Sequence, residues 1–177
     1  MHWQYKHLLN NNFHPDSKVW AYQSSRLFNL DEALEIEELL KEFTHQWKSH
    51  GTPVKSDAHL FFGQFIILIA DETATGVSGC STDSSVRLIK DIEQRFKVNM
   101  FDRTTLAFII KDKPDSYRVE LLPMTHLQHA IDNGFINLET LYFNNLVQTK
   151  DELNSNWMIA IKDSWLTKKI SISSKVL

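Results

Sequence analysis

The sequence predicts an α+β fold, a two-layer sandwich in which helices cover one face of an antiparallel-rich sheet. Three observations lead to this prediction. Residues 65–70 are an unbroken apolar run, which is typical of a central strand. An amphipathic helix is expected after Asn29, and another after the loop that contains Gly76 and Gly79. Up to Ile110 the expected order is β-α-β-β-α-β, which is the order of the ferredoxin-like split βαβ.

The N-terminal region begins with a polar stretch, residues 1–17, that we expect to form an irregular arm with one short helical turn. Residues 19–22 are bulky and predict the first strand. Asn29 predicts the start of the first helix, because its side chain can cap the helix and Glu32 occupies the capping-box position. Gly51 is the expected end of this helix.

A β-hairpin is expected next. Residues 58–62 form its first strand and residues 65–70 its second, with a tight turn at Gly63 and Gln64. A glycine followed by another residue suits a two-residue hairpin loop. The second strand is apolar on both faces, so it should be central in its sheet.

The second helix is predicted to begin at Ser81, Thr82 or Asp83, any of which can act as the N-cap, and to end near Lys97. A fourth strand at residues 104–110 then pairs with residues 117–121 in another hairpin, across a polar turn.

Shorter elements alternate in the rest of the chain, up to Trp165. Capping boxes at Thr125 and Thr149 each predict a short helix. Short strands are expected at residues 141–143 and 157–161.

Four segments follow from this order. We expect the arm at residues 1–17, an α+β core domain at 18–122, a small α/β appendage packed on that core at 123–167, and a frayed tail at 168–177.

Composition limits the classes of function. The chain has 177 residues, 42% of them hydrophobic and 23% charged, with a net charge of −3, which argues against a nucleic-acid-binding protein. One cysteine excludes an intramolecular disulfide and favours a reducing compartment. No apolar run approaches the roughly 20 residues that span a bilayer. We therefore expect a soluble, cytoplasmic protein that binds neither membranes nor nucleic acid.

The loop at residues 71–85 contains the strongest candidate site. Cys80 is surrounded by small and hydroxyl residues directly before a helix, where exposed N–H groups attract anions and lower a thiol pKa. Asp71 and Asp83 are the accompanying acid–base candidates. The alternative interpretation is that the loop is only a turn and an N-cap, with Cys80 as a small buried hydrophobic residue. The candidate ligand-binding residues are Ser81, Arg103 and Asn144.

Metal and nucleotide sites are not expected. His126 and His129 share one helical face, but no third ligand is evident near them. Residues 76–81 lack the spacing and the lysine of a P-loop, so we predict neither a metal nor a cofactor.

Several stretches together resemble a family of small uncharacterised bacterial proteins, whose members often carry the label of ABC transporter ATPases. The resemblance covers about residues 16–165 and rests on Val19-Trp20, Tyr22-Gln23-Ser24, Gly79-Cys80-Ser81, Phe101-Asp102-Arg103, residues 143–147, Thr149-Lys150, Asn156-Trp157 and residues 162–165. The chain has no Walker A motif and no ABC signature, and the resemblance implies no activity. Residues 122–145 are also similar to the second half of GYF-like peptide-binding domains, without the Gly-Tyr-Phe itself, which implies partner binding.

Two functions remain open from the sequence. The first is a binding or interaction protein without catalytic chemistry, which takes a protein partner or a small anionic ligand. The alternative is a small enzyme, or a thiol-dependent or anion-binding protein, that uses the loop around Cys80. The sequence leaves the oligomeric state undefined.

Overall fold

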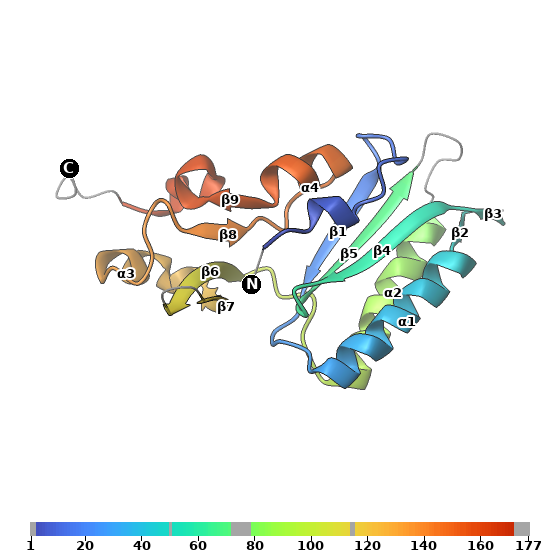
Figure 1. Ribbon diagram of the computed structural model, residues 1–177, viewed down its shortest axis with the longest axis horizontal. Helices are drawn as coiled ribbons and strands as arrows, with labels where there is room; N and C mark the ends of the chain where they lie inside the picture. Colours follow the sequence, from blue (N-terminus) through green and yellow to red (C-terminus); the bar gives the residue numbers. More distant parts are fainter. Residues whose placement is uncertain (1–2, 50, 72–78, 114–115, 172–177) are drawn as a thin grey trace. The chain divides into compact units, whose positions relative to one another are not determined.

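A computed structural model describes residues 3–49, 51–71, 79–113 and 116–171 (Figure 1). These residues form four α-helices and nine strands, and the strands pair in antiparallel sheets. The predicted mixture of helices with an antiparallel-rich sheet is therefore confirmed. Within these residues, none of the helices has the length and apolar character needed to cross a membrane.

The chain divides into two compact units. The N-terminal unit comprises His2–Asp102 and Asn145–Asn154, and the C-terminal unit comprises Arg103–Asn144 and Ser155–Leu177. The division falls before the second predicted hairpin, whereas the sequence placed the domain boundary after it, between residues 122 and 123. The N-terminal unit also takes a short segment from late in the chain.

The N-terminal unit contains most of the longer elements. Its 3-10 turn, strands and helices are η1 (Lys6–Leu8), β1 (Lys18–Gln23), α1 (Leu30–Gln46), β2 (Lys48–Ser49), β3 (Thr52–Pro53), β4 (Lys55–Phe61), β5 (Phe65–Asp71), α2 (Gly79–Phe96) and most of α4 (Lys150–Asn156).

The apolar run is the central strand of this unit, as predicted. The strand order is β1-β5-β4, both pairings are antiparallel, and all seven residues of β5 are buried. Side chains alternate along a strand, so Ile66 and Leu68 lie on one face, where they pack with Ile36 of α1 and Ile89 of α2. Figure 1 shows α1 and α2 together on one side of this sheet.

The ferredoxin-like arrangement is not confirmed. That arrangement needs the strand after α2, β6 (Thr105–Lys113), in the same sheet as β1, β4 and β5. Instead β6 belongs to a separate four-stranded sheet. The predicted order of elements is present, apart from the added β2–β3 pair, but element order does not determine which strands pair.

The capping box at the start of α1 is confirmed, and its predicted end is wrong. Asn29 accepts a hydrogen bond from the backbone N–H of Glu32, whose carboxylate accepts one from the N–H of Asn29. The helix ends at Gln46, because Trp47 turns into an extended conformation and is buried beside Phe43, with ring centroids 4.7 Å apart. Gly51, with φ of +83°, lies beyond the helix in the loop between β2 and β3.

The turn between β4 and β5 lies one residue earlier than predicted. Phe62 and Gly63 both have positive φ, 55° and 63°, and the N–H of Gln64 donates to the carbonyl of Phe61. Two successive positive-φ residues are the signature of a type I′ turn. Glycine occupies the second position, where a Cβ would lie only 3.2 Å from the Leu27 side chain.

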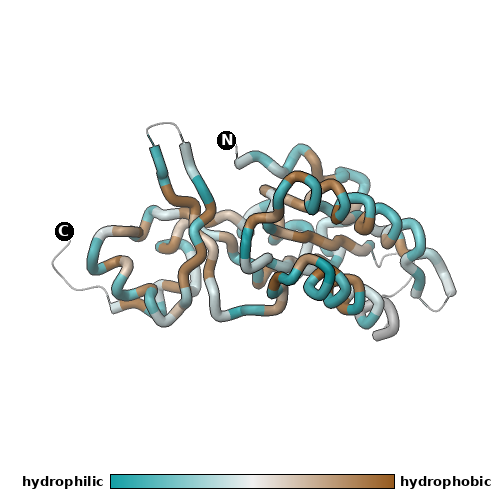
Figure 2. The backbone as a smooth tube through the Cα atoms, turned by 90° about the horizontal axis from the view of Figure 1, so that it is seen from below, coloured by the Kyte–Doolittle hydropathy of each residue, from teal (hydrophilic) through white to brown (hydrophobic). Residues whose placement is uncertain are grey.

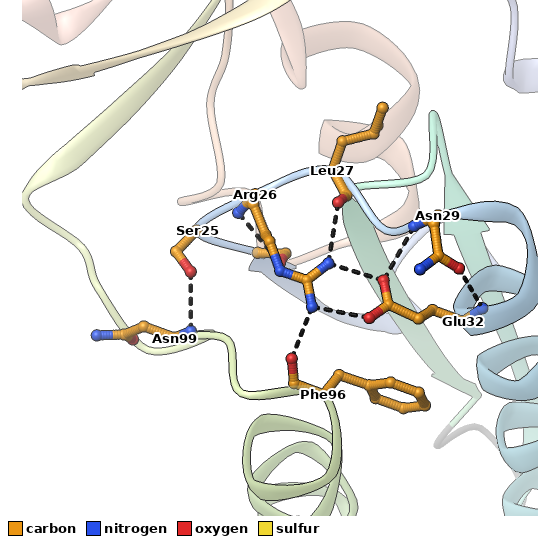
Figure 3. Close-up of polar contacts among 8 residues, drawn as sticks. Ser25, Arg26, Leu27, Asn29, Glu32, Phe96 and Asn99 are labelled. Carbon is orange, nitrogen blue, oxygen red and sulfur yellow. Dashed lines mark hydrogen bonds and ion pairs between the residues drawn. The ribbon is translucent and has the colours of Figure 1, made fainter.

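Arg26 joins the first turn of α1 to the end of α2 (Figure 3). Its guanidinium donates to both carboxylate oxygens of Glu32, at 2.7 and 2.8 Å, and also to the carbonyl oxygens of Leu27 and Phe96. The hydrogen bond from Arg26, followed by that from the Asn29 backbone, lowers the pKa of Glu32 to about 2. The planar guanidinium of Arg26 therefore links the first turn of α1 to the end of α2.

The N-terminal arm packs against residues 145–154, which return to the unit late in the chain. Val19 donates its N–H to the carbonyl of Gln148, and Lys150 donates its N–H to the carbonyl of Ser17, so the returning segment lies along the open edge of β1. The buried Lys150 ammonium donates to the carbonyl of Phe13 in the arm. The arm does contain the expected short turn, η1, and Tyr5, Leu9 and Phe13 of the arm are buried, whereas Leu8 is 53% exposed.

The C-terminal unit is built on the second sheet, with order β7-β6-β8-β9. Its elements are β6, β7 (Ser116–Pro123), η2 (Met124–His126), α3 (Leu127–Asp132), β8 (Leu141–Phe143), β9 (Met158–Ala160), η3 (Ile161–Asp163) and η4 (Trp165–Lys169). The β6–β7 hairpin and both short strands were predicted. Phe108, Tyr142 and Leu127 form the centre of the core, with Ile161 and Leu166 beside them.

The two later capping boxes have different outcomes. The hydroxyl oxygen of Thr149 accepts from the N–H of Glu152, which confirms the cap of α4. Thr125 does not cap α3, because a 3-10 turn occupies its position. The amide of Gln128 instead forms hydrogen bonds with Asp132 and with the backbone of Ser171.

Candidate functional site

One face of the β6–β7 hairpin forms the first wall of a groove in the C-terminal unit. The strands pair with Phe108 opposite Glu120 and Ile110 opposite Arg118. Paired residues point to the same side of a sheet, so these four side chains line one surface. Figure 2 shows the hairpin changing from hydrophobic residues at its base to hydrophilic residues near its tip. The groove therefore becomes more polar away from the core.

The second wall comes from α3 and the turn that follows it. Gly134, with φ of +72°, ends the helix, and the N–H groups of Phe135 and Ile136 both donate to the carbonyl of Ala130. This tight turn buries Ile136 to 5% exposure and leaves Phe135 71% exposed. The turn therefore holds the large aromatic side chain of Phe135 at the groove, where most of it is exposed to solvent.

Together these walls enclose a cavity of about 620 Å³. That volume lies within the range of roughly 300–1,000 Å³ usual for ligand pockets. The apolar lining residues are Phe108, Ile110, Leu122, Ala130, Phe135 and Ile136, and the polar ones are Arg118, Glu120, His126 and His129. An apolar pocket with a few polar groups suits a ligand that is largely hydrophobic.

The charges on the hairpin wall compensate one another. The guanidinium of Arg118 pairs with the carboxylate of Glu120 and, at 3.6 Å, with that of Asp112. On the opposite wall the amide of Asn133 lies 3.3 Å from Nδ1 of His129 and donates to the carbonyl of the same residue. The groove therefore offers polar contacts without a strong net charge.

The groove borders the edge of the second sheet. Strand β7 is the first strand in the order, and among the described residues it pairs only with β6. An edge strand presents backbone N–H and C=O groups that another extended chain can pair with. The side chains of Arg118, Glu120 and Leu122 face the groove from this strand.

Asp71, the acid–base candidate at the end of β5, takes part in an ion pair. Its side chain is buried to 3% exposure, and the ammonium of Lys55 lies 2.7 Å from Oδ2. The same ammonium donates to the carbonyl of Asn12 and lies over the ring of Phe13. This arrangement connects the arm to the sheet and gives Asp71 a structural contact.

The other loop candidates are only partly described. The backbone of α2 begins at Gly79, before the predicted caps, but the side chains of Cys80 and Ser81 lie outside the described residues. Asp83 is exposed on the first turns of α2.

The structure assigns the remaining candidates to the other unit. Arg103 is an exposed residue of the C-terminal unit, which begins with it. Asn144 ends the first segment of that unit, half-buried, and its N–H donates to the carbonyl of Trp157 at 2.6 Å. Asp71 and Asp83 belong to the N-terminal unit, so these four residues are not gathered in a single unit.

No group of three or more potential ligands in the described part of the chain has the arrangement of a metal site. His126 and His129 were expected on one face of a helix, but His126 lies in η2 and His129 in α3. Both line the groove described above.

The groove itself was not found from the sequence. Its residues come from a hairpin, a short helix and a turn, and each of these segments has an ordinary composition. The one available signal was the apolar Phe135 directly after Gly134, at the end of a short helix.

No family model, curated protein or solved structure matches the chain. The geometry of the site therefore carries the functional argument.

Proposed function

We propose that the protein is a binding protein whose C-terminal unit takes an extended segment of a partner protein into the groove between β6–β7 and α3. The observation that carries this proposal is an apolar cavity of about 620 Å³, with the exposed Phe135 beside an edge of β7 that no other described strand pairs with.

An extended segment fits both features of the groove. Its backbone would pair with β7, which has a partner on one side only within the described residues. Side chains alternate along an extended chain, so every second side chain of the partner would point into the cavity. Apolar residues at those positions would contact Phe108 and Ile110 on the floor and Phe135 at the rim.

Binding is favoured over catalysis by the residues that line the groove. Its lining is mostly apolar, and the charged side chains of Arg118 and Glu120 are paired with each other. The likeness of residues 122–145 to GYF-like domains supports the same proposal, because these residues include α3 and Phe135. The single cysteine suits a protein that acts in a reducing compartment such as the cytoplasm.

The test begins with selection of displayed random peptides on the full-length chain. An enriched peptide is then synthesised, and its dissociation constant is measured by fluorescence polarisation on the wild type and on variants. Phe135→Ser and Ile110→Asp should each weaken binding about tenfold or more, because loss of one large apolar contact is worth roughly 1.5–3 kcal/mol. Tyr117→Ser is the matched control, since Tyr117 is exposed and lies on the opposite face of β7.

Amide hydrogen exchange tests the strand pairing separately. Peptide binding should slow exchange along Ser116–Pro123, and N-methylation of alternate peptide amides should abolish both the binding and the protection. The proposal is wrong if no peptide is enriched, or if the groove variants bind the enriched peptide as tightly as the Tyr117→Ser control.

A further inference from the structure

A second surface feature lies in the N-terminal unit, on the outward face of α1. Leu30 and Leu34 are 74% and 55% exposed. Leu30 and Leu34 are one helical turn apart on α1, so the two form one apolar strip that we call the leucine ridge. Leu27 precedes the helix, and its side chain lies close to the turn at Gly63. Grouped exposed apolar side chains of this size are typical of interaction surfaces.

The leucine ridge is distinct from the face of α1 that packs in the core. Ile36 and Leu40 are buried against the sheet, whereas Leu30 and Leu34 are on the opposite side of the helix. The ridge is also fixed in place. Arg26 pairs with the carboxylate of Glu32 in the first turn of α1 and so fixes the start of the helix (Figure 3).

The ridge is surrounded by negative charge. Helix α1 carries six acidic side chains and a single lysine. Glu32 and Glu35 are paired with Arg26 and Arg95, and Glu42 accepts a hydrogen bond from an amide.

Three further carboxylates, those of Asp31, Glu37 and Glu38, are exposed and form no ion pair or side-chain hydrogen bond with any described residue. Glu37 and Glu38 follow Leu34 by three and four positions, and Asp31 precedes it by three, so all three flank the ridge.

We propose that the leucine ridge binds an amphipathic helix of a partner protein, with an apolar stripe flanked by lysine or arginine. The apolar stripe would cover Leu30 and Leu34, and the basic flanks would pair with Asp31, Glu37 and Glu38, as flanking charges do between paired helices. A second copy of the same ridge would place carboxylates against carboxylates, and an anionic membrane surface would repel them. This surface is separate from the groove of the C-terminal unit.

The probe is a synthetic amphipathic helical peptide of leucine and lysine, compared with a leucine and glutamate peptide of the same pattern. We expect the full-length chain to bind the lysine peptide in fluorescence polarisation, with an affinity that falls as salt rises. The glutamate peptide should bind at least tenfold more weakly. Chemical-shift changes on binding should concentrate in the first half of α1.

Variants then test each part of the ridge. The double change Leu30→Ser with Leu34→Ser should weaken binding of the lysine peptide tenfold or more, and Glu37→Lys should weaken it severalfold. The controls are Leu146→Ser, which alters an equally exposed leucine, and Asp163→Lys, which alters an exposed acid elsewhere. Circular dichroism confirms folding, which should be unchanged because the substituted side chains are exposed.

Two results would overturn the proposal. One is an affinity for the lysine peptide that is absent, or that is the same in ridge variants and controls. The other is a dimer in sedimentation that the Leu30 and Leu34 changes dissociate, since this would assign the ridge to a second copy of the chain.

Discussion

Tyr5 connects the N-terminal arm to residues 145–154, which return to the N-terminal unit late in the chain. Substitution of Tyr5 tests how much this connection contributes to the stability of the unit. The side chain is 2% exposed, its hydroxyl donates to the carbonyl of Leu153 at 2.5 Å, and its ring lies 5.6 Å from that of Phe61. Leu153 is in the last turn of α4, where carbonyl groups have no partner within the helix. The hydroxyl therefore satisfies a polar group that would otherwise be buried alone.

Tyr5→Phe keeps the ring and removes this hydrogen bond. Leaving a buried carbonyl unsatisfied costs about 1–3 kcal/mol in the free energy of unfolding. For a domain of about 100 residues, each kcal/mol lowers the melting temperature by roughly 4 °C. Tyr5→Ala also removes the ring from its contacts, so its expected cost is larger, about 3–5 kcal/mol. Urea denaturation followed by circular dichroism measures both.

The pH dependence provides an independent check of the same contact. Burial raises the pKa of Tyr5 from 10.0 to about 12. Because the folded pKa is above the unfolded one, the contribution to stability is complete below pH 10 and is lost as the pH rises towards 12. The difference in stability between wild type and Tyr5→Phe should therefore shrink above about pH 10.

Equal stability of the wild type and Tyr5→Phe at neutral pH would refute this reasoning. It would mean that the carbonyl of Leu153 has another partner, or that the arm does not pack on α4 in solution. A difference that persists unchanged at alkaline pH would refute the burial of the hydroxyl.

Three further changes test the rest of the N-terminal unit. Ile67→Ala, at a fully buried position of the central strand, should cost about 2–5 kcal/mol in urea denaturation, and a cost near zero would contradict the central position of β5. Gly63→Ala should lower the melting temperature in calorimetry and reduce the free energy of unfolding by about 1 kcal/mol or more. The reason is that φ is +63° and the new methyl group would press on Leu27. An unchanged melting temperature would show that the turn relaxes. Glu32→Gln should make the free energy of unfolding fall less steeply as the pH is lowered. The pKa of Glu32 is lowered from 4.5 to about 2, so the wild type loses the stability contributed by the ionised carboxylate between these two pH values. Identical acid-denaturation profiles of the wild type and the variant would contradict the pairing of Glu32 with Arg26.

Local signals were sufficient for much of the fold. The capping box of Asn29 and Glu32 depends on residues three apart, and the apolar run of β5 is recognisable without any partner, so both could be predicted. The end of α1 could not be predicted from local signals. Burial of Trp47 beside Trp20 and Phe43 depends on the sheet, and it outweighs the local preference for a stop at Gly51.

Strand pairing was the main part that the sequence left undefined. The alternation of Phe108 and Ile110 suits a strand in either sheet, because the pattern specifies a buried face and not a neighbour. The groove could not be predicted for a similar reason, because Phe108, Ala130 and Phe135 become one surface only after the hairpin and α3 pack together. The loop around Cys80 was the more visible feature in the sequence because it contains the only cysteine of the chain.

The position of residues 145–154 along the edge of β1 has a consequence for synthesis in the cell. A ribosome adds roughly 5–20 residues each second, so the first sheet emerges several seconds before the segment that covers its edge. During that interval a nascent chain exposes an unpaired strand to its neighbours. Messages truncated before residue 145 should therefore yield aggregation-prone fragments, although they encode every strand of that sheet.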